Sequence, residues 1–94
     1  MKISYDPAKN ERNVRERGLS FERAAEFDFV AAVTVEDKRR DYGEIRYRSL
    51  GLIDDEVHAL VFTFRDGSLR VISLRRANRK ERRFYAEEAE SGNG

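Results

Sequence analysis

The sequence predicts a small α+β domain in which two N-terminal helices precede a mostly antiparallel sheet of three or four strands, and one C-terminal helix follows it. Two runs of apolar, β-branched and aromatic residues flank Asp66-Gly67, which is a strong short-range signal for a β-hairpin. Two helical patterns precede these runs, and a third begins at Asn78. We expect a single domain over residues 1–90 and a disordered tail at 91–94.

The first part of the chain is expected to hold a short strand and both N-terminal helices. Residues 2–5 alternate between polar and apolar types, as a strand does. Asp6 can cap a helix over 7–17 that ends at a glycine. Because this helix is almost wholly polar, we expect it on the surface, anchored by Val14. Ser20 is expected to cap the second helix.

The remaining elements follow from β-branched runs and from one capping pattern. We expect the strands at 31–35, 44–52, 57–65 and 68–76. Asn78 followed by Glu81 predicts a capping box at the start of the last helix. We expect that helix to pack through Phe84 and to end near Ala89.

Composition limits the chemistry that the chain can perform. Charged residues make up 39% of the chain while the net charge is only +1, so a nucleic-acid-binding surface must be a local patch. With no cysteine and one histidine, His58, we expect no zinc site and no cofactor. No apolar run approaches the ~20 residues of a membrane span, and no secretory signal is evident. We therefore expect a cytoplasmic protein without membrane contact.

Cations crowd the hairpin and the start of the last helix. Between Arg65 and Arg83 there are eight Arg or Lys residues and two acids. The first turn of a helix favours acids, yet cations surround Glu81 there. Cations in this turn are repelled by the positive end of the helix dipole, so we expect the chain to use its positive field to bind a polyanion or an acidic partner. The alternative is that the charged run is only a solvent-exposed face.

Three groups of residues occur along the chain, and their order and spacing together are more specific for a protein family than any single group is. They are Asp6-Pro7-Ala8-Lys9 with Asn13, Gly18 and Ser20-Phe21-Glu22-Arg23-Ala24; Tyr42-Gly43-Glu44-Ile45-Arg46 with Leu50-Gly51; and Thr63-Phe64-Arg65 with Arg70-Val71-Ile72-Ser73-Leu74-Arg75-Arg76-Ala77, Glu81 and Tyr85. Over nearly the whole chain, this arrangement resembles the BrnT family of type II toxins.

The resemblance implies a RelE-like fold and a ribonuclease that arrests translation. It also implies a cognate BrnA-like antitoxin with a ribbon-helix-helix domain, so that operator DNA is bound only through the antitoxin. Members of the family often carry histidine where this chain has Arg17, and His or Tyr where it has Phe62. Both changes remove possible proton-transfer groups.

Metal-free RNA cleavage needs a base for the 2′-hydroxyl, an acid for the 5′ oxygen, and cations for the charge on phosphorus. Arginine serves the last role because its planar fork matches two phosphate oxygens. The candidate catalytic residues are Arg46, Arg65, Arg70, Arg75, Lys9 and Glu44. The candidate RNA-binding residues are Arg39, Arg40, Tyr42, Ser73, Arg76, Arg79, Lys80 and Arg83.

Alternatives remain for these residues and for the function. Each arginine could instead pair with Glu44 or Asp66 across strands. His58 is more consistent with a partly exposed strand residue than with a catalytic group. The same arginine patch could also serve a non-catalytic nucleic-acid-binding module or a protein-interaction domain.

Overall fold

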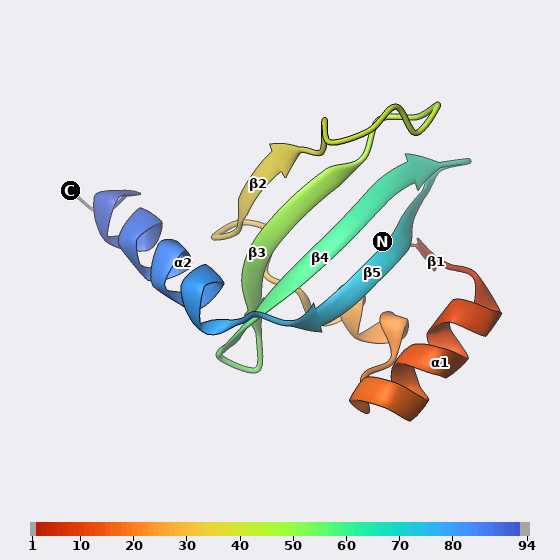
Figure 1. Cartoon of the computed structure of the whole chain (residues 1–94), viewed down its shortest axis with the longest axis horizontal. Helices are drawn as coiled ribbons and strands as arrows, with labels where there is room; N and C mark the ends of the chain where they lie inside the picture. Colours follow the sequence, from red (N-terminus) through yellow and green to blue (C-terminus); the bar gives the residue numbers. More distant parts are fainter. Residues whose placement is uncertain (1, 93–94) are drawn as a thin grey trace.

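The computed structural model describes residues 2–92, which form a five-stranded mixed sheet with flanking helices. The elements in chain order are β1 (Ile3–Ser4), α1 (Pro7–Arg17), the 3₁₀ helix η1 (Phe21–Glu26), β2 (Val33–Glu36), β3 (Tyr47–Ile53), β4 (Glu56–Arg65), β5 (Ser68–Arg76) and α2 (Arg79–Gly92). The strand order is β1-β5-β4-β3-β2, and only β1 runs parallel to its neighbour among the described strands (Figure 1).

The predicted arrangement of two N-terminal helices and a sheet of three or four strands is wrong. The second segment has the expected Ser20 cap, but it is a six-residue 3₁₀ helix whose chain becomes extended at Phe27. Its hydrogen bonds, such as Arg23 N–H to Ser20 O at 3.1 Å, span three residues, a pattern that rarely persists over long runs. The sheet gains its fifth strand because Ile3 and Ser4 pair in parallel with β5.

The boundaries of α1 are confirmed, but its anchor is not the predicted one. Asp6 Oδ1 accepts from Ala8 N–H at 2.9 Å, and Gly18 ends the helix with φ at 65°. Val14 is 46% exposed, whereas Asn13 is buried. The Asn13 amide donates to Leu19 O and to Leu74 O, each at 2.9 Å. The polar side chain of Asn13 therefore anchors α1 at the edge of β5.

The core lies between η1 and one face of the sheet. Its fully buried members include Leu60 and Leu74, which lie directly opposite each other on β4 and β5. The segment after η1 approaches the sheet so closely that a Cβ built on Gly51 would lie 2.5 Å from Phe27 Cζ. The other core residues are Leu19, Phe21, Ala24, Phe27, Ile53, Phe62, Leu69 and Val71.

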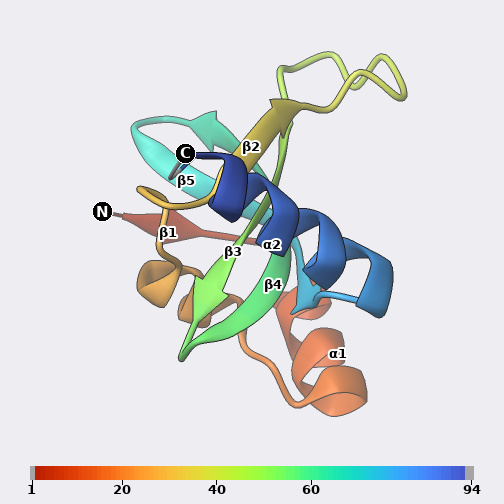
Figure 2. The same cartoon turned by 90° about the vertical axis from the view of Figure 1, so that its left-hand side faces the viewer.

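The opposite side of the sheet is here called the open face. Because side chains alternate along a strand, the neighbours of Leu60 and Leu74 point away from the core. Figure 1 looks onto this face, and Figure 2 shows η1 on one side of the sheet with α1 and the start of α2 toward the other. The open face is defined by Val33, Val35, Arg48, Leu50, Ala59, Val61, Ser73 and Arg75.

The hairpin and the last helix are largely as predicted. β4 and β5 pair antiparallel around Asp66 and Gly67, whose φ angles of 52° and 75° suit a tight hairpin turn. The expectation that Phe84 packs the last helix is wrong, because Phe84 is 46% exposed and Tyr85 is the buried residue. That helix continues past Ala89 to Gly92, and residues 93–94 of the predicted tail lie outside the described residues.

Candidate functional site

A groove of about 380 Å³ lies on the open face, between the sheet and α2. Its floor is apolar and is built by Val33, Val35, Leu50, Ala59 and Val61. Phe84 of α2 contributes an aromatic side chain, and four cations and one carboxylate supply the charges. These charged residues are Arg39, Arg48, Arg75, Lys80 and Glu81.

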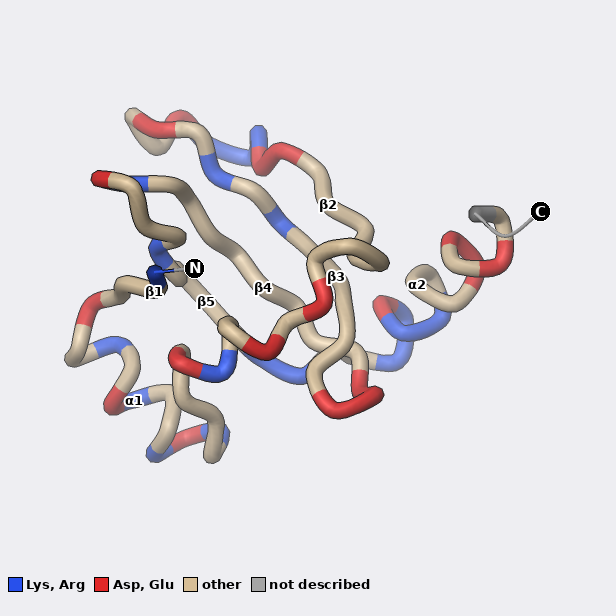
Figure 3. Tube along the Cα trace, turned by 180° about the vertical axis from the view of Figure 1, so that it is seen from behind, with Lys and Arg blue, Asp and Glu red and all other residues tan. Residues whose placement is uncertain are grey.

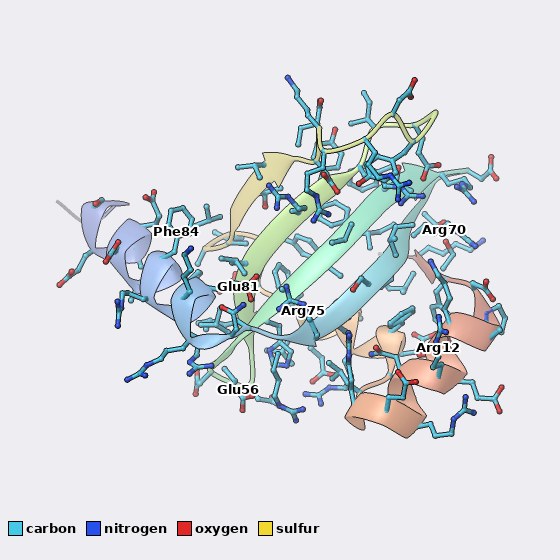
Figure 4. All side chains as sticks on the ribbon, in the orientation of Figure 1. Arg12, Glu56, Arg70, Arg75, Glu81 and Phe84 are labelled. Atoms are coloured by element: carbon cyan, nitrogen blue, oxygen red, sulfur yellow. The ribbon has the colours of Figure 1, made fainter. Side chains whose placement is uncertain are left out.

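An ion pair joins β5 to the first turn of α2 at this groove. Arg75 Nη1 and Nη2 donate to the two carboxylate oxygens of Glu81 at 2.7 and 2.9 Å (Figure 4). Glu81 and Asn78 also form the predicted capping box, with reciprocal hydrogen bonds of 2.8 and 2.9 Å. The guanidinium lowers the pKa of Glu81, and the carboxylate raises the pKa of Arg75, so both groups stay charged.

A second ion pair holds the opposite edge of the groove. The Asp37 carboxylate is 1% exposed and accepts from Arg39 Nε at 2.8 Å and from Nη2 at 2.7 Å. This pairing holds the pKa of Asp37 far below its ordinary value. Arg48 Nε lies 4.0 Å from Asp37 and makes no hydrogen bond to any side chain within residues 2–92. The Arg48 guanidinium is therefore available to a ligand.

The family model described as "Ribonuclease toxin, BrnT, of type II toxin-antitoxin system" matches residues 5–81. This chain belongs to that family. No curated protein matches it. The BrnT match covers α1, η1 and strands β2 to β5, and it ends at Glu81. As a toxin of a type II pair, this BrnT family member has a cognate antitoxin as its partner.

The structure brings three of the candidate catalytic residues together at the far end of the hairpin. Glu44 accepts from Arg65 at 2.6 Å and from Arg46 at 2.9 Å. Arg65, and then Arg46, lower the pKa of this carboxylate. The Arg46 guanidinium lies 4.3 Å from the centre of the Tyr42 ring. We call Tyr42, Glu44, Arg46 and Arg65 the hairpin-tip cluster.

Other predicted catalytic residues are widely separated. Arg75 lies opposite Ala59 on β4, whereas Arg65 is six residues further along that strand. At ~3.4 Å per residue, this places Arg65 and Arg75 roughly 20 Å apart along the sheet. Arg70 lies between them, opposite Thr63. One phosphate cannot contact all three arginines.

The remaining candidates occupy different surfaces. Lys9 and Ser73 line a second cavity of about 300 Å³ between α1 and β5, here called the α1 cleft. Arg76 pairs with Glu56 at 2.8 Å, outside the groove. Arg40, Arg79 and Arg83 are exposed and line neither cavity.

Three positions with possible proton-transfer roles lie outside the groove. Phe62 is 4% exposed and belongs to the core, so a side chain at that position points away from the groove. His58 is buried rather than partly exposed, and its Nδ1 lies 2.8 Å from Glu56 O. Arg17 lines the α1 cleft.

The sequence-based candidates omitted three groove residues. Arg48 could have been found from its alternation with Leu50, which places both on one face of a strand. Glu81 was assigned only a capping role, although its carboxylate also binds Arg75. Phe84 was expected to lie in the core. Only the spatial position of α2 reveals that Phe84 lines the groove.

Within residues 2–92, no group of three or more His, Cys, Asp or Glu side chains is arranged to hold a metal ion. In the same part of the chain, no helix is long and apolar enough to cross a membrane.

Proposed function

We propose that this BrnT family member is a metal-independent endoribonuclease, that its active site is the groove on the open face, and that it arrests translation in the cytoplasm by cleaving RNA. The observation that best supports this proposal is the Arg75–Glu81 pair beside an apolar groove with further cations. An ionised carboxylate next to several guanidinium groups meets the needs of a reaction in which a proton leaves and charge builds on phosphorus.

The proposed reaction is transesterification within the RNA chain. The 2′ oxygen forms a bond to the adjacent phosphorus, and the bond from phosphorus to the 5′ oxygen breaks. Glu81 takes the proton of the 2′-hydroxyl, and Lys80 donates a proton to the departing 5′ oxygen. The products are a 2′,3′-cyclic phosphate and a 5′-hydroxyl, and proton exchange with water restores both side chains.

The arginines have a separate role in this proposal. Arg75 and Arg48 bind the non-bridging phosphate oxygens, whose negative charge increases toward the transition state. When one of the Arg75 guanidinium nitrogens donates to the phosphate instead of to Glu81, Arg75 stabilises the Glu81 carboxylate less. The basicity of Glu81 therefore rises as substrate binds, which favours proton abstraction.

Phe84 is proposed to position a base beside the cleaved bond. Its ring lines the groove and is 46% exposed, so it is accessible for stacking. Stacking of a base on an aromatic side chain contributes about 1–3 kcal/mol in single-strand binding proteins. Tyr42 is the second proposed stacking residue, but its ring already faces Arg46.

The cognate antitoxin is proposed to be a BrnA-like ribbon-helix-helix protein that binds operator DNA for the complex. The cationic groove supports an acidic segment as the part of the antitoxin that covers it. Co-expression with the adjacent reading frame tests this, because the two products should co-purify. Separate elution at micromolar concentration would count against it.

The experiment that tests the proposed function is cleavage of a defined RNA, in the presence of a chelator, by single variants. Glu81→Gln should slow cleavage by about 10²- to 10⁴-fold, the usual contribution of a general base. Glutamine still supports a capping box, so circular dichroism should show an unchanged fold. Glu56→Gln is the matched control, because it disrupts the Arg76–Glu56 pair outside the groove and should leave the rate unchanged.

The other outcomes also decide the proposal. Loss of cleavage in Glu44→Gln, with full activity in Glu81→Gln, would move the active site to the hairpin-tip cluster. Wild-type protein that binds RNA and never cleaves it would make the chain a non-catalytic binding module. Cleavage that stops when the chelator is added would contradict metal independence.

A further inference from the structure

The α1 cleft holds a group of cations that the proposed reaction does not use. It lies between the helix α1 and the β5 edge of the sheet and has a volume of about 300 Å³. Three cations and one acid line it, which gives a local net charge of +2. These four residues are Lys9, Arg12, Arg17 and Glu16, and the other lining residues are Asn13, Phe21, Ile72 and Ser73.

Among the described residues, the cations of this cleft have no acidic partners. Lys9, Arg12 and Arg17 are exposed, and none forms an ion pair with an acid in the described residues 2–92. Glu16 is four residues from Arg12, a spacing that permits a helical ion pair, yet the structure has none there. Elsewhere, Arg65, Arg75 and Arg76 are each paired with a carboxylate.

The backbone of β5 is irregular at this cleft. The β4–β5 register passes from Val61 opposite Ser73 to Phe62 opposite Val71, so Ile72 has no partner on β4. Such bulges re-aim side chains and are enriched next to functional sites. Ile72 and Ser73 both line the cleft, so the bulge directs this part of β5 toward α1.

The cleft is adjacent to the groove at Ser73. Ser73 lies opposite Val61, which is part of the groove floor, and Ser73 itself lines the cleft. Two strand spacings separate Arg48 on β3 from Ser73 on β5, or roughly 10 Å. Figure 4 shows Arg12 and Arg70 on the β5 side of the sheet, so positive side chains continue beyond the groove in that direction.

From these observations we infer that the α1 cleft is a phosphate-backbone subsite for RNA. Arg12, Arg17 and Lys9 bind phosphates outside the cleaved bond, in a strand that crosses the β5 edge at Ser73. The inference rests on the proposed function, because RNA is the ligand. Contacts remote from the reacting phosphate strengthen binding of long substrates equally in the ground and transition states, so they lower KM and leave kcat unchanged.

Binding tests the subsite independently of cleavage. The probe is a 2′-O-methyl RNA oligonucleotide, which has no 2′-hydroxyl to react. Each lost phosphate contact should flatten the slope of log K against log salt by about 0.7. Arg12→Ala and Arg17→Ala should each show this change. Arg15→Ala removes the same charge from the same helix, outside the cleft, and should retain the wild-type slope.

Cleavage assays supply the second readout. Arg12→Ala should raise KM for a long RNA without changing kcat, and should cleave a dinucleotide as the wild type does. Wild-type salt slopes in Arg12→Ala and Arg17→Ala would overturn the subsite, as would an equal loss in Arg15→Ala. If the wild type cleaves RNA while these slopes stay unchanged, only the subsite fails. If the slopes change and no RNA is cleaved, only the proposed reaction fails.

Discussion

The buried carboxylate of Asp37 holds Arg39 and Tyr42 in position at the edge of the groove. It accepts hydrogen bonds from Arg39 and from the Tyr42 hydroxyl, the latter at 3.1 Å. A buried charge is tolerated only when it is paired and hydrogen-bonded in this way. The Arg39 pairing lowers the pKa of Asp37 below its ordinary value of 3.8. The contribution to stability is therefore present above 3.8 and is lost as the pH falls toward the folded-state pKa.

This pKa shift predicts the pH dependence of Asp37→Asn. At pH 7 the variant should have a lower free energy of unfolding than the wild type, because the Arg39 ion pair is lost. The difference should shrink as the pH falls below 3.8, where the unfolded wild type gains a proton. Urea unfolding at pH 7 and pH 3 measures both values. A difference that does not vary with pH would contradict the assigned role of the carboxylate.

Single residues also mark where sequence reasoning fails. Val14 was the expected anchor of α1 because it is the apolar residue within that helix. The actual anchor, Asn13, acts through two carbonyl groups, one of them Leu74 O, which is 61 residues away in sequence. No local pattern identifies such a partner, because an asparagine on a polar helix is equally consistent with solvent exposure.

Among the elements, those set by local chemistry could be predicted and those set by distant pairing could not. The limits of α1 follow from Asp6 and Gly18, and the hairpin follows from Asp66-Gly67. The alternation at residues 2–5 predicts a strand, and the structure has one at Ile3–Ser4. Its parallel pairing with β5 could not be predicted, because so short a segment does not reveal its partner. The RelE-like character of the whole fold stays a prediction.

The packing of α2 supplies a prediction about two adjacent aromatic residues. Tyr85 is 8% exposed and its hydroxyl donates to Ala31 O at 3.3 Å, whereas Phe84 is 46% exposed. Tyr85→Ala should lower the free energy of unfolding by on the order of 3 kcal/mol, the usual cost of removing a buried aromatic ring. Phe84→Ala should cost less than about 1 kcal/mol. Chemical denaturation of both variants decides this, and a larger loss in Phe84→Ala would contradict the packing.

At the scale of the whole molecule, the sequence predicts a single basic patch and the structure divides it. The hairpin-tip cluster forms because Glu44 reaches Arg65 across 21 residues of sequence, and the groove pair forms because Glu81 faces Arg75. Figure 3 shows acidic residues at the β3–β4 turn and along the later part of α2. Sequence reasoning found most of the cations. It could not assign their partners, since that depends on the strand register.

The proposed function requires RNA to bind on the open face of the sheet. It is tested most directly by ¹H–¹⁵N NMR titration of the wild-type protein with 2′-O-methyl RNA. RNA bound on the open face should shift the Arg48 and Arg75 side-chain Nε–H signals and the Ser73 amide, and should leave the amides of Ala24 and Phe27 on the covered side unchanged. Shifts concentrated at Ala24 and Phe27, with Arg48 and Arg75 unaffected, would contradict it.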